Sequence, residues 1–145
     1  MDAFQDVTEI TAWQLAHKLN LRVDLFLLSP EFRRHYKHAN RLSDVVRSAP
    51  RNIAEGFAGD RSVFAERLRL AKGSQAEVLD HLADAYDQCL ITFDEWQISE
   101  RLTKRAIRAA NGLIRSLEST GEAGAEMPAK RRSRPPRRRA PRDLD

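Results

Sequence analysis

Apolar residues recur every three or four positions along most of this chain, which is the spacing of one face of a helix. The first such run lies between residues 12 and 27. Its members are Ala12, Leu15, Ala16, Leu19, Val23, Phe26 and Leu27. The alternation of apolar and polar residues that is typical of a β-strand is almost absent. The pattern therefore predicts an all-α fold.

A second helix is predicted over residues 31–58, with Ser29 as its N-cap and Pro30 in its first turn. Its apolar positions are Leu42, Val45, Val46, Ala49, Ile53 and Phe57. This stripe keeps its phase across Pro50, although proline removes one backbone donor. We therefore expect one kinked helix rather than two separate ones.

Two further helices follow a break at Gly59-Asp60. Asp60 or Ser62 is expected to cap a third helix over residues 61–91. Its core positions are Phe64, Leu68, Ala71, Gln75, Val78, Leu82, Ala85 and Cys89. A capping box at Asp94-Glu95-Trp96-Gln97 is expected to open the fourth helix. The core positions of that helix are Ile98, Leu102, Ala106, Ala109, Leu113 and Leu117.

Short turns between four long helices predict an antiparallel up-down four-helix bundle over residues 1–118. A monomeric bundle needs only one apolar stripe on each helix. The first and fourth helices carry apolar residues off their main stripes, namely Leu21, Leu25, Leu28, Ile107 and Ile114. Such extra residues indicate either subunit contacts or a broader core, and we expect the protein to self-associate into a homo-oligomer.

The last 27 of the 145 residues form a separate, basic segment. Residues 1–118 hold 17 Lys and Arg against 17 Asp and Glu, so the whole excess of +4 lies in residues 119–145. Glycine, proline and charge dominate this tail, which we expect to be disordered. Its cations without aromatic neighbours suit sequence-independent contact with phosphates. The seven clustered cations are Lys130, Arg131, Arg132, Arg134, Arg137, Arg138 and Arg139.

A solubilising appendage and a nuclear-localisation look-alike are the competing interpretations of the tail.

Other features narrow the class of protein. No apolar run approaches the roughly 20 residues of a membrane span, and the acidic N-terminus lacks a signal-peptide core. The one cysteine, Cys89, permits no disulfide within the chain, so we expect a reducing, cytoplasmic compartment. No Glu-x-x-His di-iron motif occurs, and we expect no metal, no cofactor and no enzymatic activity.

Two segments go beyond generic patterning. Ser48-Ala49-Pro50-Arg51-Asn52-Ile53-Ala54-Glu55-Gly56-Phe57 resembles the S-I-P-x-N-I-A-E-G-F motif of the bacterial four helix bundle family, also called the 23S rRNA-intervening-sequence proteins. The segment from Phe64 through Ala71-Lys72-Gly73-Ser74-Gln75-Ala76-Glu77 resembles that family's E-F-x-x-F-L-x-x-A-x-G-S-x-x-E motif. Trp13 with Ala16 is similar to its early W-x-x-A. The resemblance covers about residues 6–118.

The resemblance implies a homopentameric ring of four-helix protomers without known enzymatic activity. It also implies a relation to the accessory proteins of diversity-generating retroelements, which bind nucleic acid and partner a reverse transcriptase. Basic residues usually precede the S-I-P element in this family. This chain has Ser43 and Asp44 there, and Arg41 where glutamine is common.

The polar and small residues of the two motifs allow a functional and a structural interpretation. They are Ser48, Pro50, Asn52, Glu55, Gly56, Gly73, Ser74 and Glu77. A catalytic site would need a nucleophile beside its base, and neither motif offers such a pair. We therefore favour buried partners at the kink, with Gly56 and Gly73 permitting close approach of helices.

Between Glu31 and Arg51 the predicted second helix carries six cations against Glu31 and Asp44, a net charge of +4. Five of them are candidates for phosphate contact: Arg33, Lys37, Arg41, Arg47 and Arg51. A solvated helix face is the alternative. The sequence thus predicts a homo-oligomer that binds DNA or RNA through charge. In one version of this hypothesis the protein is an accessory to a reverse transcriptase. A protein-interaction scaffold without a nucleic-acid role is the second hypothesis.

Overall fold

The computed structural model describes residues 4–122, and every regular element among them is helical. A short 3₁₀ helix, η1 (Val7–Glu9), precedes α1 (Thr11–Phe26) and the five-residue α2 (Pro30–Arg34). Three long helices follow: α3 (Tyr36–Ala58), α4 (Arg61–Asp87) and α5 (Phe93–Glu122). No strand occurs within residues 4–122. The all-α prediction is confirmed.

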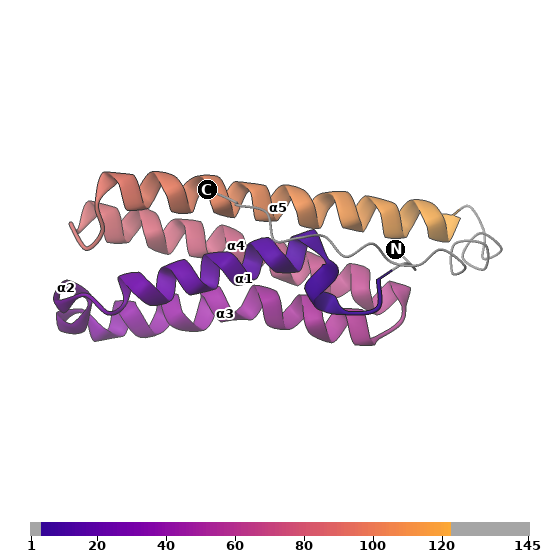
Figure 1. The fold of residues 1–145 in the computed structure, drawn as a ribbon, viewed down its shortest axis with the longest axis horizontal. Helices are drawn as coiled ribbons and strands as arrows, with labels where there is room; N and C mark the ends of the chain where they lie inside the picture. The colour runs from indigo at the N-terminus through magenta and orange to yellow at the C-terminus, as the bar shows by residue number, and fades with distance from the viewer. Residues whose placement is uncertain (1–3, 123–145) are drawn as a thin grey trace.

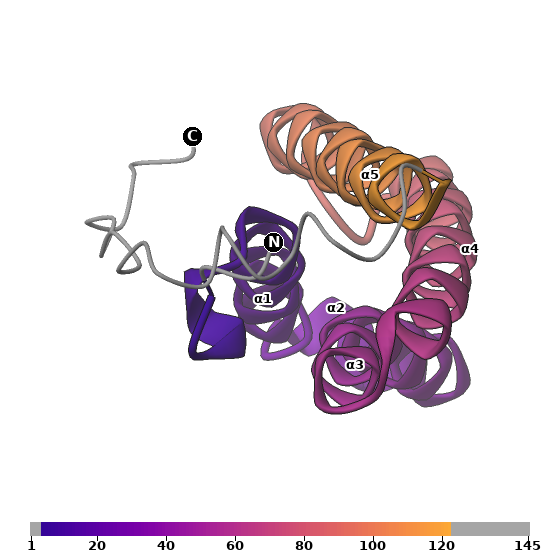
Figure 2. The same cartoon turned by 90° about the vertical axis from the view of Figure 1, so that its right-hand side faces the viewer.

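The four long helices lie side by side (Figure 1). Seen end on, α4 lies between α3 and α5, and α1 faces the space between α3 and α5 (Figure 2). The contacts agree, since α4 packs on α3 and α5, and α1 packs on the same two helices. Two apolar clusters fill the interior. One gathers around Phe32 and Leu82, and the other around Ile53 and Leu68.

Helix α1 buries the face that its spacing predicts. Ala12, Leu15, Ala16, Leu19, Val23 and Phe26 are buried. Only Leu27, the last residue of the predicted stripe, is half-buried, because it lies beyond the end of the helix. Each large side chain contributes on the order of 1.5–3 kcal/mol to the free energy of unfolding. This helix is therefore held by its core face.

The buried face of α5 differs from the prediction at three of the expected core positions. Ile98, Ala109 and Leu113 are only half-buried. Its core residues are instead Leu102, Ala106, Ala110, Ile114 and Leu117. The face advances by four residues at each of three successive steps, so it rotates slowly around the axis. Ile114 therefore belongs to the core and is not surplus apolar surface.

The predicted helix over residues 31–58 is interrupted at His35. The backbone of His35 leaves the helical region (φ −114°, ψ 53°), and α3 begins at Tyr36. Phe32 of α2 is completely buried. Between Phe32 and Ala39 the only apolar side chain is Tyr36, which is 62% exposed. This stretch offers no buried apolar side chain that would hold a continuous helix against the core, and the chain turns so that Phe32 is buried.

Other boundaries agree with the local signals. Helix α3 continues through Pro50, which is buried, so the predicted continuity across the proline is confirmed. The Ser29 hydroxyl accepts a hydrogen bond from the Phe32 N–H (3.3 Å), and the Asp60 carboxylate accepts one from the Val63 N–H (2.9 Å). The predicted N-cap at Ser29 is therefore correct, and Asp60 rather than Ser62 caps α4.

The end of α4 corrects the prediction that Cys89 is a core residue. Helix α4 ends at Asp87, and Cys89 is exposed with a left-handed backbone (φ 62°). The Leu90 N–H donates to the Ala85 carbonyl (2.8 Å) and the Cys89 N–H to the Tyr86 carbonyl (3.0 Å). These are the two bonds of a Schellman motif, which needs a left-handed residue where Cys89 stands. These hydrogen bonds to carbonyls of the last turn end α4 before the apolar stripe predicted from the sequence ends.

The capping box of α5 lies two residues earlier than predicted. The Thr92 N–H donates to the Glu95 carboxylate (2.8 Å), and the Glu95 N–H donates to the Thr92 hydroxyl (3.1 Å). Asp94 is a first-turn residue rather than the cap. At its other end α5 continues to Glu122, past the predicted domain boundary at residue 118. Residues 119–122 include no large apolar side chain, so apolar spacing could not predict these last helical positions.

Candidate nucleic-acid interface

The polar residues of the two motifs meet across α3 and α4. The Ser48 and Ser74 hydroxyls share a hydrogen bond of 2.8 Å. The Asn52 amide donates to the carbonyl (3.0 Å) and hydroxyl (3.1 Å) of Ser48, one turn earlier on α3. Asn52 then accepts a bond from Arg67 of α4 (3.0 Å). These contacts join the two helices, but the side chains that make them are half-buried, so the expectation of buried partners is met only in part.

Arg67 is the member of this network that the sequence analysis missed. Its guanidinium also donates to the Glu55 carboxylate (3.3 Å). One signal could have found it: residues at similar distances on either side of the short turn at Gly59-Asp60 face each other when α3 and α4 run in opposite directions. The network holds hydroxyls, an amide and an ion pair. It offers no base positioned to activate a nucleophile.

The two motif glycines differ. Gly56 is buried, and a Cβ there would lie 2.7 Å from the Arg67 Cβ and 3.0 Å from the Phe64 Cδ1. A side chain at this position would therefore push α3 and α4 apart. Gly73 is exposed, and a Cβ there would meet nothing within 4 Å. The prediction of close approach is confirmed for Gly56 and wrong for Gly73, which faces solvent rather than a neighbouring helix.

Two of the candidate cations, Lys37 and Arg41, lie beside grooves between α3 and α4. A shallow groove of about 490 Å³ has Arg41, Ser48 and Ser74 along it. A smaller groove of about 220 Å³ has both Lys37 and Arg41. Arg41 and Ser48 therefore lie on the same side of α3.

Carboxylates lie along the same grooves, which makes their charge mixed. Asp44 and Glu77 line the larger groove and Asp84 the smaller one. Glu77 lies 3.5 Å from His81, and Asp84 lies 3.7 Å from His38. A carboxylate repels a phosphate as strongly as a cation at the same distance attracts it. The α3–α4 grooves therefore provide less attraction for a polyanion than the cation count of the sequence predicts.

Arg47 differs from the other candidate cations because its guanidinium is engaged. It donates to the Asp24 carboxylate of α1 (2.8 Å) and to the Ser43 hydroxyl (2.6 Å). The ion pair with Asp24 ties α1 to α3. We therefore assign Arg47 a structural role and remove it from the phosphate-contact candidates. Its sequence neighbours gave no sign of this, because Asp24 lies on another helix.

Arg33 and Arg51 are exposed, on α2 and α3 respectively. Arg33 stands in the last turn of α2, where a positive charge favours the helix end. The candidate cations thus occupy two helices rather than one continuous stripe. The seven tail cations Lys130, Arg131, Arg132, Arg134, Arg137, Arg138 and Arg139 lie outside the described residues.

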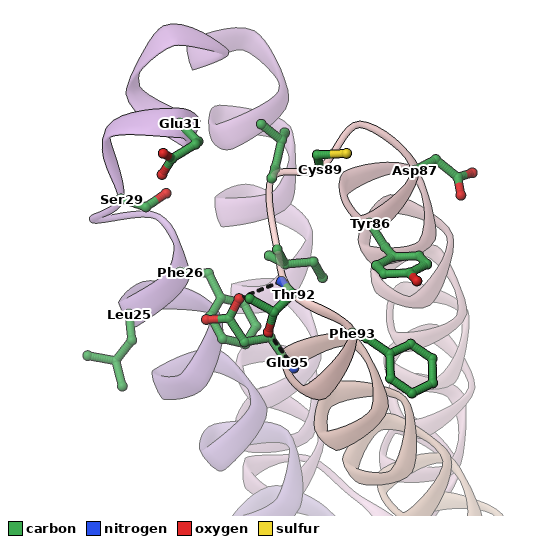
Figure 3. A pocket seen from close by; sticks show the side chains of 12 residues that line it. Leu25, Phe26, Ser29, Glu31, Tyr86, Asp87, Cys89, Thr92, Phe93 and Glu95 are labelled. Atoms are coloured by element: carbon green, nitrogen blue, oxygen red, sulfur yellow. Dashed lines mark hydrogen bonds between the residues drawn. The ribbon is translucent and has the colours of Figure 1, made fainter.

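A larger pocket, of about 810 Å³, opens where the end of α1, α2 and the α4–α5 turn meet. Figure 3 shows Tyr86 and Phe93 close together on one side, Leu25 on another, and Glu31 and Asp87 at the rim. The Tyr86 and Phe93 ring centroids are 6.0 Å apart. The sequence analysis did not identify this pocket, because its residues come from two stretches far apart in the chain, 25–31 and 86–95.

Two other features are absent from residues 4–122. No group of three or more His, Cys, Asp or Glu side chains in that range is arranged to hold a metal ion. The helices of the same range contain no segment with the length and hydropathy of a membrane span.

Comparison with known proteins places most of the helical region in one family. A family model described as 23S rRNA-intervening sequence protein matches residues 8–112. That range includes both polar motifs and the α3–α4 grooves, so the resemblance inferred from the motifs is confirmed. No curated protein and no solved structure gives a significant match.

Proposed function

Since the chain belongs to the 23S rRNA-intervening sequence protein family, we propose that it is a non-enzymatic homo-oligomer that binds DNA or RNA through charge. In this proposal the four long helices form an up-down bundle in the cytoplasm. The basic tail makes most of the phosphate contacts, and the exposed cations Arg33, Lys37, Arg41 and Arg51 add weaker ones.

The separation of charge along the chain is the observation that carries this proposal. Residues 1–118 have no net charge, while residues 119–145 carry the whole excess of +4. Within the helices, the cations beside the α3–α4 grooves face carboxylates, and Arg47 is held by Asp24. Long-range attraction of a polyanion therefore has one dominant source, the tail.

Self-association would strengthen this binding. Leu21, Leu25 and Leu28 are 52%, 67% and 64% exposed. Large apolar side chains gathered on a surface commonly mark a contact between proteins. An oligomer, a pentamer by the family resemblance, would present several tails to one nucleic acid and raise their effective concentration.

The test is fluorescence anisotropy with labelled DNA and RNA oligonucleotides at several salt concentrations. The full-length protein is compared with a deletion of residues 123–145, which leaves α5 intact. We expect the deletion to weaken binding at least tenfold at low salt. Seven cations would contribute a salt slope of up to about 6. A variant with Arg41 and Arg51 changed to glutamine is the control, and its affinity should fall far less.

Equal affinities of the full-length and truncated proteins would contradict the assignment to the tail. In that case the exposed cations of α2 and α3 would be the binding residues.

A protein-interaction scaffold is the second candidate, and the exposed leucines of α1 favour it. This scaffold function would be preferred if neither form binds nucleic acid. An accessory role beside a reverse transcriptase is one form of the first proposal. Co-purification of such an enzyme with the full-length protein, and its loss with the tail deletion, would support that form.

A further inference from the structure

The pocket of about 810 Å³ at the α4–α5 turn combines apolar and aromatic surface with negative charge. Its floor consists of the buried side chains Phe26, Leu90 and Ile91. Tyr86 and Phe93 form an aromatic wall, and they are 38% and 52% exposed. Such exposed rings beside a depression offer a stacking surface to a planar or cyclic group.

The charge of the pocket has a single sign. Glu31, Asp87 and Glu95 line it, and none of its lining residues is Lys, Arg or His. Glu95 is engaged in the capping box with Thr92, whereas Glu31 and Asp87 are exposed. In Figure 3 they lie on opposite sides of the α4–α5 turn, Glu31 on α2 and Asp87 at the end of α4. The pocket therefore suits a cationic ligand with apolar or planar parts.

We propose that this pocket docks the Arg/Pro-rich stretch Lys130–Arg139 of a second copy of the chain. This stretch contains seven cations and the pair Pro135-Pro136. Adjacent prolines restrict the backbone to an extended form, which aromatic-lined grooves bind. Arginine guanidinium groups stack on aromatic rings and make paired hydrogen bonds with carboxylates. The occupant thus matches the pocket in charge, in planarity and in ring contacts.

The reach of the chain favours a second copy over the molecule's own tail. Helix α5 begins at Phe93 beside the pocket and ends at Glu122, about 44 Å away at 1.5 Å per residue. The nine residues from Glu122 to Arg131 span about 31 Å when fully extended. The 17 residues to Arg139 have a root-mean-square reach of only about 23 Å. A molecule could fill its own pocket only by stretching its tail.

The position of Leu25 gives a second reason. This side chain lines the pocket and also belongs to the exposed leucine group Leu21, Leu25 and Leu28. A copy that packs against those leucines lies next to the pocket. If the end of α5 in that copy lies beside the leucines, its tail reaches the pocket at high effective concentration.

The first test uses a fluorescein-labelled peptide of residues 128–142 and no nucleic acid, so it is independent of the proposed function. The host is the full-length chain with the seven cations of Lys130–Arg139 changed to glutamine, which removes competition from its own tail. We expect saturable binding by anisotropy, weakened at least fivefold by Asp87→Lys. This substitution suits the fold, because a cation favours the C-terminal end of α4.

The matched control is Asp80→Lys, an exposed carboxylate of the same helix outside the pocket. It should change the affinity less than twofold. Equal weakening by the two substitutions would overturn the proposal, because it would reveal general charge attraction. Absence of saturable binding to the host would overturn it too.

The second test identifies the donor of the tail. Wild-type chains with ¹⁴N and ¹⁵N are mixed, and a carbodiimide couples carboxylates to the amine of Lys130, the one lysine after residue 118. We expect peptides that join Lys130 of one isotope to Glu31 or Asp87 of the other. If these peptides are absent, or carry one isotope only, the assignment to a second copy is wrong.

Discussion

Replacing Gly56 by alanine tests how closely α3 and α4 approach each other. The new Cβ would lie 2.7 Å from the Arg67 Cβ, which is well below an ordinary contact between carbon atoms. The Arg67 Cβ is attached directly to the backbone, so a rotation of the arginine side chain does not relieve the overlap. Helix α4 must shift instead, and the hydrogen bond from Arg67 to Asn52 shifts with it.

The size of the effect follows from two opposing contributions. Overpacking a close contact costs about 1–3 kcal/mol, whereas alanine in place of glycine inside a helix stabilises by about 1 kcal/mol. Gly73→Ala is the matched control, because Gly73 lies inside α4 and a Cβ there would meet nothing within 4 Å. We expect Gly73→Ala to stabilise by about 1 kcal/mol. Both variants gain the higher helix propensity of alanine. The difference between their free energies of unfolding therefore measures the cost of the overlap at Gly56, about 1–3 kcal/mol.

The assay is thermal and urea unfolding followed by circular dichroism at 222 nm. All proteins are compared at one concentration, because association raises the apparent stability. At about 4 °C per kcal/mol, Gly56→Ala should melt roughly 4–12 °C below Gly73→Ala. If the two variants unfold together, or if Gly56→Ala is the more stable, the inferred contact between the helices is incorrect.

Two further predictions concern assembly and the α3–α4 network. Leu25→Asp should lower the mass measured by light scattering while the helical circular dichroism persists. The control is Leu70→Asp on α4, where Leu70 is 47% exposed, and it should leave the mass unchanged. A wild-type protein that is monomeric at micromolar concentration would contradict this prediction. Asn52→Ala should lower the free energy of unfolding by about 1–3 kcal/mol, because Arg67 and Ser48 lose a partner. Asn40→Ala, an exposed position of the same helix, should cost far less, and equal stability of the two variants would remove the structural role of Asn52.

Local signals in the sequence determined most of the helices. The caps at Ser29 and Asp60 are read correctly because an N-cap bond joins residues three positions apart. The core face of α1 follows from spacing alone, since one stripe on a regular helix can face only one way. The two polar motifs were sufficient to identify the family, because their residue types and spacing are visible without a structure.

Tertiary structure decided where helices end and what their polar residues do. The break at His35 depends on the burial of Phe32, and the end of α4 depends on carbonyl bonds that leave Cys89 left-handed. Spacing cannot show either feature, because it describes a helix that is already regular. The shift of the α5 core to Ala110 and Ile114 depends likewise on how that helix packs against its neighbours.

The candidate sites divide in the same way. The sequence by itself established that the excess charge lies in residues 119–145, because formal charge needs no coordinates. It could not tell Arg47, which is held by Asp24 of another helix, from Arg41, which lies at an open groove. Nor could it separate Gly56 from Gly73, or gather Glu31, Asp87 and Phe93 around one pocket. Those distinctions rest on contacts between segments far apart in the chain, and only packing brings such segments together.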